Sequence, residues 1–118
     1  MEIEVNDNIA VIRSDDPIIT DRQSALDLIS TLVYDYDIHR LAVPSAAVTQ
    51  DLFKLSTGAA GEVLQRFVGY GVKIAIFGDF TRYTSKSLHD YIYECNKGNA
   101  VFFTATEEEA IARLSAAK

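Results

Sequence analysis

Two stretches rich in apolar residues flank a short polar segment near the start of the chain. Ile3-Glu4-Val5 and Ile9-Ala10-Val11-Ile12 flank the polar triplet Asn6-Asp7-Asn8. Apolar runs on both sides of a short Asn/Asp segment are typical of a β-hairpin, because Asn and Asp tolerate the positive φ angles of a tight turn. The pattern therefore predicts two antiparallel strands at the start of the chain.

Helical spacing of apolar residues begins after residue 20. Thr20 and Gln23 fit a capping box, in which two side chains satisfy backbone N–H groups at the start of a helix. The apolar positions that follow recur every three or four residues and share one face: Ala25, Leu26, Ile29, Leu32 and Val33. We therefore expect a helix that begins at Thr20 and buries this face.

Three more helices are expected further along the chain. One begins near Ser56-Thr57 and ends at a Gly-Tyr-Gly triplet, and a second covers about residues 84–96. Gly98 is expected to take the left-handed conformation after that second helix, and Thr106 caps the third. Short apolar runs between the helices predict buried strands: 41–43, 72–77 and 101–103.

The order of these elements predicts the fold class. Strands and helices follow as β-β-α-β-α-β-α-β-α within 118 residues, a length typical of one domain, which we assign to residues 1–118. Strands that alternate with single helices imply right-handed crossovers and parallel pairing, whereas the opening hairpin is antiparallel. We expect an α/β protein with a mixed, mostly parallel five-stranded sheet and four helices.

The charge of the chain is acidic and unevenly placed. There are 17 acidic and 11 basic side chains, and residues 1–59 hold 10 of the acids but only 4 of the bases. Binding to nucleic acid or to an anionic membrane requires a concentrated basic surface, so neither is expected as a partner. The acidic half would instead steer the domain toward a basic protein surface.

Cysteine content and hydropathy indicate a soluble cytoplasmic protein. Cys95 is the one cysteine, so it can form neither an internal disulfide nor a multi-cysteine zinc site, and its apolar helix face predicts an inert core thiol. No stretch reaches the ~20 apolar residues of a membrane span, and Met1-Glu2-Ile3-Glu4 does not resemble a signal peptide. His39 and His89 lack further ligands at metal spacing, so no metal and no cofactor are expected.

Several stretches resemble a bacterial domain-of-unknown-function family of small proteins. The resemblance extends over nearly the whole chain, and the stretches that carry it are residues 20–27, 55–62, 73–88 and 93–98. The family implies no activity. The element order is also similar to that of STAS (anti-sigma-factor antagonist) domains, and this resemblance implies a STAS-like regulatory domain.

One short segment carries a local part of the STAS resemblance. STAS regulators have an Asp-Ser-Ser/Thr-Gly segment at the start of a helix, and a partner kinase phosphorylates one of its hydroxyls. Here the matching segment is Leu55-Ser56-Thr57-Gly58, with leucine in place of the acidic residue. Ser56 and Thr57 are therefore candidates for phosphorylation, with simple capping of the helix as the alternative.

The loop from Asp79 to Lys86 is the second candidate site. It follows the carboxyl end of a strand and enters a helix, where open α/β sheets bind ligands. Arg82 and Lys86, beside the helix N-terminal amides, could hold a phosphate or a carboxylate. The alternative is structural: a turn at Asp79, a packed aromatic residue, and a helix cap at Thr84 or Ser85.

Six tyrosines are many for so short a chain. Tyrosine combines a large apolar ring with a polar hydroxyl and is common at protein interfaces. Most of the six are expected at the rim of the core. Tyr34 and Tyr36, which stand beside Asp35 and Asp37, are expected to be exposed.

These features favour a non-enzymatic regulatory or protein-interaction module. Its working surface would be the helix near Ser56-Thr57 and the loop Asp79–Lys86. The alternative is a binding protein for a nucleotide or another small anion at the helix entrances near Ser56 and Thr84. An exposed hairpin edge could also pair two copies of the chain into a homodimer.

Overall fold

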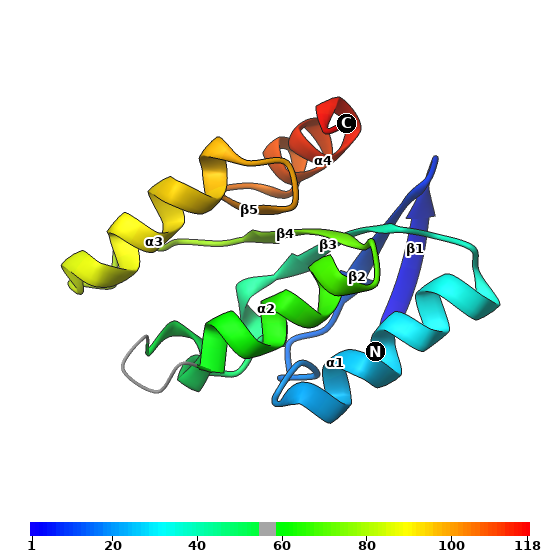
Figure 1. The fold of residues 1–118 in the computed structure, drawn as a ribbon, viewed down its shortest axis with the longest axis horizontal. Helices are drawn as coiled ribbons and strands as arrows, with labels where there is room; N and C mark the ends of the chain where they lie inside the picture. Colours follow the sequence, from blue (N-terminus) through cyan, green and yellow to red (C-terminus); the bar gives the residue numbers. More distant parts are fainter. Residues whose placement is uncertain (55–58) are drawn as a thin grey trace.

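The computed structural model describes residues 1–54 and 59–118 and confirms the predicted α/β architecture (Figure 1). Five strands form one sheet in the order β1-β2-β3-β4-β5, and only the β1–β2 pair is antiparallel. The strands are β1 (Glu2–Asn6), β2 (Ile9–Arg13), β3 (Arg40–Pro44), β4 (Lys73–Phe77) and β5 (Val101–Thr104). The helices are α1 (Arg22–Ser30), α2 (Ala59–Gly69), α3 (Lys86–Lys97) and α4 (Glu107–Ala116).

The sheet separates two apolar layers. Successive right-handed crossovers that advance in one direction place their helices on one face of a sheet. Accordingly, alternate strand residues such as Leu41 and Ile74 pack with α1, α2 and Leu88 of α3, whereas Ala42 and Ala75 pack with α4 on the other face. Figure 1 shows α1 and α2 on one side of the strands and α4 on the other.

The predicted hairpin is confirmed. Asn6 pairs with Ile9, so Asp7 and Asn8 form the turn, and Asp7 takes a φ of 56°. A positive φ is uncommon outside glycine, and Asp and Asn are among the residues that adopt it most readily. The polar triplet thus supplies the backbone geometry that the turn requires.

The predicted start of α1 is wrong by one residue. Asp21, not Thr20, is the N-cap: its carboxylate accepts from the backbone N–H of Ser24 at 2.8 Å, and the Ser24 hydroxyl accepts from the N–H of Asp21 at 3.0 Å. These hydrogen bonds lower the pKa of Asp21. A charged carboxylate is a stronger acceptor than the Thr20 hydroxyl and also suits the positive end of the helix dipole.

Gly98 does not adopt the expected left-handed conformation. Its φ is −90°, and its N–H donates to the carbonyl of Cys95 at 3.0 Å, which closes the last turn of α3 without a positive φ. Left-handed residues follow two of the other helices instead: Gly71 after α2, with φ 73°, and Asp37 after α1, with φ 53°.

Asn96 binds the outer edge of β5. Its side-chain Oδ1 accepts from the backbone N–H of Phe103 at 2.8 Å, and its Nδ2 donates to the carbonyl of the same residue at 3.1 Å. An edge strand presents unpaired backbone groups that invite pairing with another chain. Here one amide side chain satisfies a donor and an acceptor together and fixes α3 against the sheet.

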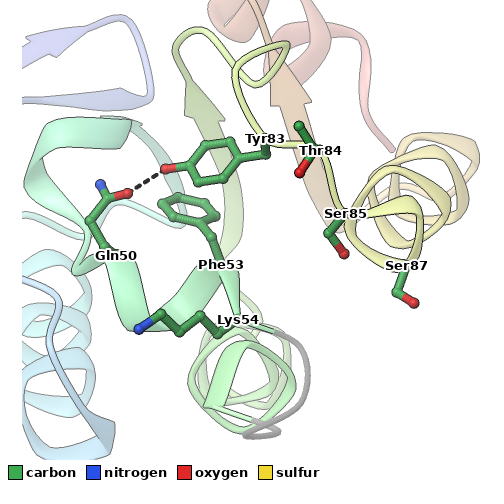
Figure 2. Close-up of a pocket in the computed structure, with 7 residues that line it drawn as sticks. All are labelled: Gln50, Phe53, Lys54, Tyr83, Thr84, Ser85 and Ser87. Atoms are coloured by element: carbon green, nitrogen blue, oxygen red, sulfur yellow. Dashed lines mark hydrogen bonds between the residues drawn. The ribbon is translucent and has the colours of Figure 1, made fainter.

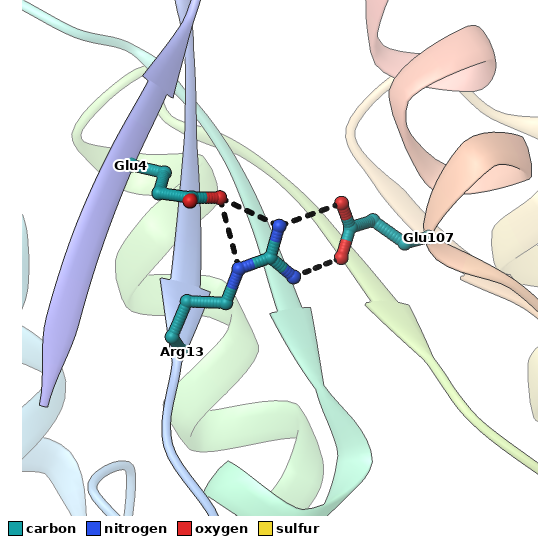
Figure 3. Close-up of polar contacts among 3 residues, drawn as sticks. All are labelled: Glu4, Arg13 and Glu107. Atoms are coloured by element: carbon teal, nitrogen blue, oxygen red, sulfur yellow. Dashed lines mark hydrogen bonds and ion pairs between the residues drawn. The ribbon is translucent and has the colours of Figure 1, made fainter.

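Arg13 joins the hairpin to α4 (Figure 3). Its guanidinium donates to Glu4 through Nε at 2.9 Å and Nη2 at 2.6 Å, and to both carboxylate oxygens of Glu107. These contacts raise the pKa of Arg13 and lower that of Glu107. These ion pairs lie at the surface, so they orient the hairpin relative to α4 more than they add to the free energy of unfolding.

Candidate functional site

The carboxyl ends of β3 and β4 support the two walls of a cleft. β3 continues into two 3-10 turns, η2 (Ser45–Ala47) and η3 (Gln50–Phe53), and β4 continues into a loop that reaches α3. The cleft between them has a volume of about 620 Å³ and is open to solvent. Figure 2 shows its lining residues: Gln50, Phe53, Lys54, Tyr83, Thr84, Ser85 and Ser87.

Aromatic rings fix the first wall. The ring centroids of Phe53 and Tyr83 lie 5.3 Å apart, and Phe80 lies 5.7 Å from Phe53. Phe80 in turn meets Phe103 of β5 edge-on at 5.4 Å. Phe53 and Phe103 are buried, whereas Tyr83 is half-buried. The exposed edge of this wall is therefore continuous with the core, which restrains it.

A polar network covers the same wall. The Tyr83 hydroxyl donates to Oε1 of Gln50 at 2.5 Å, and Nη2 of Arg82 donates to that oxygen at 3.2 Å. Arg82 also donates to the Tyr83 hydroxyl at 3.1 Å, which raises the pKa of Arg82. These bonds join η3 to the loop after β4, two segments more than thirty residues apart in sequence.

Asp79 organises the start of the loop. Its carboxylate accepts from the Thr81 hydroxyl at 2.5 Å and from the Thr81 backbone N–H at 3.0 Å. These bonds lower the pKa of Asp79. The geometry is an Asx turn, which holds the loop before it reaches Arg82.

The second wall is the beginning of α3. Ser85 is its N-cap, and its hydroxyl accepts from the backbone N–H of Leu88 at 3.2 Å. The sequence predicts Thr84 or Ser85 as this cap, and the structure confirms Ser85. Lys86 donates to Asp90 one turn later at 2.9 Å, and Nε2 of His89 lies 2.5 Å from the carbonyl oxygen of Tyr83. Thr84, Ser85 and Ser87 line this side of the cleft, and Tyr83 and Phe53 line the other (Figure 2).

The structure places some of the predicted site residues in the cleft and others beside it. Thr84 and Ser85 line the cleft, and Arg82 braces one wall. Asp79 and Lys86 lie exposed in the adjoining loop and helix. Arg82 and Lys86 donate to different partners, Gln50 and Asp90, so the two cations do not converge on a common position. Ser56 and Thr57 lie outside the described residues, so the predictions made for them stay predictions.

The sequence analysis missed Gln50, Phe53 and Lys54. They lie in or directly after η3, and a 3-10 turn this short gives no helical or strand periodicity of apolar residues in the sequence. The one signal was the apolar pair Leu52-Phe53, both buried in the structure. An apolar pair between a strand and a helix indicates a packed segment but does not indicate what it packs against.

Other predicted chemistry can also be compared with the described residues. Cys95 packs against the core but is half-buried rather than within it, and this burial raises the pKa of its thiol; that the thiol is inert stays a prediction. Within residues 1–54 and 59–118, no group of His, Cys, Asp and Glu side chains is arranged to hold a metal ion. None of the helices described there has the length and apolar character needed to cross a membrane.

Comparison with known proteins adds one result. A family model, described as a domain of unknown function (DUF4180), matches residues 4–114. No curated protein and no solved structure matches the chain. The match begins within β1 and ends within α4, so the cleft lies inside the matched region.

Proposed function

The chain belongs to the DUF4180 family, and from that premise we propose that it is a non-enzymatic regulatory module that binds a protein partner through the cleft. A STAS-like role, which the element order suggested from the sequence, would make it a regulator of this kind. We place the interaction in the cytoplasm, in keeping with a sequence that has a single cysteine. The partner would contact the cleft and the exposed loop from Asp79 to Lys86.

The shape of the cleft carries this proposal. Pockets for small molecules usually enclose 70–90% of the ligand surface. This cleft is open to solvent, so a small molecule bound there would keep much of its surface in water. A side chain of a protein partner would be covered by the rest of the partner, which makes an open cleft with rigid walls suited to a protein contact.

The surroundings of the cleft have the composition of a protein interface. Tyr83 offers apolar ring surface beside the buried Phe53, whereas Asp79, Arg82 and Lys86 form an exposed charged rim in the adjoining loop and helix. Protein interfaces typically combine an aromatic, desolvated centre with a polar rim. The charges of both signs on this rim would select the orientation of the partner.

The polar groups of the site support a binding role more than a catalytic one. Asp79 binds Thr81, Arg82 binds Gln50 and Tyr83, Lys86 binds Asp90, and His89 meets the Tyr83 carbonyl. A catalytic site needs such groups to converge on the same reacting atoms. Here each group organises its own part of the loop or helix.

A second candidate is the binding of a small anion, such as a nucleotide. Three hydroxyls at the N-terminal end of α3 line the cleft, where the helix dipole favours negative charge: those of Thr84, Ser85 and Ser87. The ammonium of Lys54 instead lies 3.5 Å from the carboxylate of Asp51 and points away from these hydroxyls in Figure 2. We therefore place this candidate second.

A matched pair of variants tests the proposal. Ser87→Arg puts a bulky cation into the cleft, and Ser115→Arg makes the same change at an exposed position of α4 on the other face of the sheet. We expect wild-type and Ser115→Arg baits to capture the same protein from source-cell lysate, and Ser87→Arg to lose at least about tenfold of it. Equal capture by all three baits would contradict the proposal. Stabilisation by AMP or phosphate without any captured protein would favour the second candidate.

A further inference from the structure

Three exposed tyrosines lie near the amino ends of the parallel strands, at the end of the sheet opposite the cleft. Tyr34 is 79% exposed, Tyr36 46% and Tyr70 54%. They precede β3 and β4, in the connections from the C-terminal ends of α1 and α2. The parallel strands place these connections at the amino ends of the strands, whereas the cleft lies at the carboxyl ends. With Tyr93 of α3, four of the six tyrosines are exposed, so the expectation that most lie at the core rim is wrong, whereas the exposure predicted for Tyr34 and Tyr36 is confirmed.

The backbone at Tyr34 and Tyr36 is irregular but held in place. After α1 the chain passes into a π-helical turn, η1 (Thr31–Asp35), and the N–H of Ile38 then donates to the carbonyl of Leu32 at 2.9 Å. Leu32 and Ile38 are buried, while residues 34–37 are all exposed. Because both ends of this segment are buried and hydrogen-bonded to each other, the four residues between them are held facing outward. Such π-helical turns are frequent at functional sites.

Tyr70 lies at the same end of the sheet. β3 and β4 are neighbours, and the backbone N–H of Lys73 donates to the carbonyl of His39 at 2.9 Å. The turn that carries Tyr70 and the segment that carries Tyr36 therefore lead into adjacent strands. Gly71, with φ 73°, makes that turn.

We propose that this tyrosine surface (Tyr34, Asp35, Tyr36, Asp37 and Tyr70) docks an arginine- and lysine-rich segment of a partner protein. Exposed tyrosine rings attract cations through their faces, and the interleaved carboxylates complement the same charges. Residues 34–37 hold two carboxylates and no basic side chain. A second copy of this chain would bring like charges together and is disfavoured.

This docking site is independent of the proposed function. The cleft and the tyrosine surface use different elements at opposite ends of the parallel strands. Loss of one interaction should leave the other intact. The chain could then hold two partners, one at each end.

A peptide titration tests the docking site. The probe is a synthetic peptide of alternating arginine and alanine, added to the ¹⁵N-labelled full chain at low ionic strength. We expect amide shifts concentrated at residues 34–37 and 70–71, and weakening of the interaction as salt rises. The double variant Tyr34→Ala/Tyr36→Ala keeps every carboxylate and should bind the peptide about tenfold more weakly.

Tyr93→Ala is the control, because Tyr93 is 63% exposed but lies on α3, outside the tyrosine surface. It should bind the peptide like the wild type. Equal weakening in both variants, unchanged binding in the double variant, shifts spread over all acidic regions, or no binding would each overturn the proposal. All three chains are compared at matched thermal stability, and the substituted tyrosines are exposed, so unfolding is not expected.

Discussion

Asn96→Ala should lower the free energy of unfolding by about 2 kcal/mol. The substitution removes both hydrogen bonds to the backbone of Phe103, each of which contributes about 1 kcal/mol. It also leaves an N–H and a carbonyl of β5 without the amide that satisfied them. Alanine is the better helix former by about 0.5 kcal/mol, which offsets part of the loss.

Denaturant unfolding and hydrogen exchange measure this effect. The Phe103 amide should lose its protection first, because it alone gives its N–H to Asn96. Asn99→Ala is the matched control, since Asn99 is exposed and follows the helix; it should change stability by less than about 0.5 kcal/mol. An Asn96→Ala chain as stable as the wild type would show that the side chain does not hold β5.

Gly78→Ala should cost about 1–3 kcal/mol, because there is no room for a side chain at this position. A Cβ on Gly78 would overlap the Ser45 hydroxyl and lie 2.8 Å from the Ser45 Cβ. Gly78 begins the loop that carries Tyr83, and Ser45 begins the turns that carry Gln50. Their close approach therefore sets the distance between the two segments that the polar network joins.

Ser45→Gly provides the rescue for this prediction. The double variant removes the atoms that the new methyl group would meet, so it should be more stable than Gly78→Ala alone. The coupling energy from the double-mutant cycle should be about 1–2 kcal/mol in favour of the pair. Gly69→Ala is the control, because a Cβ there meets nothing within 4 Å. Additive effects of the two substitutions would contradict the close approach.

The order of elements could be predicted because it depends on local pattern. Apolar alternation with Asn6-Asp7-Asn8 predicted the hairpin, and the apolar run 72–77 predicted β4. The exact cap of α1 was missed because Thr20 and Asp21 are both good capping residues. Only the geometry of the preceding chain decides which one reaches the N–H of Ser24.

The candidate site could be predicted only in part. Thr84 and Ser85 could be predicted because they lie in the loop after β4, and ligand sites occur at the carboxyl ends of parallel strands. Gln50 and Phe53 could not be found, since 3-10 turns leave no periodic signal. The contact between Arg82 and Gln50 joins residues 32 positions apart, and nothing in the local sequence of either residue indicates the other.

Site-specific photocrosslinking tests the central claim most directly, namely that the cleft contacts a protein partner. A photoreactive phenylalanine analogue replaces Ser87 in one chain and Ser115 in another, and each chain is irradiated in source-cell lysate. We predict a covalent adduct with one protein from position 87 and none with that protein from position 115. No adduct from position 87, or equal adducts from both positions, would contradict the claim.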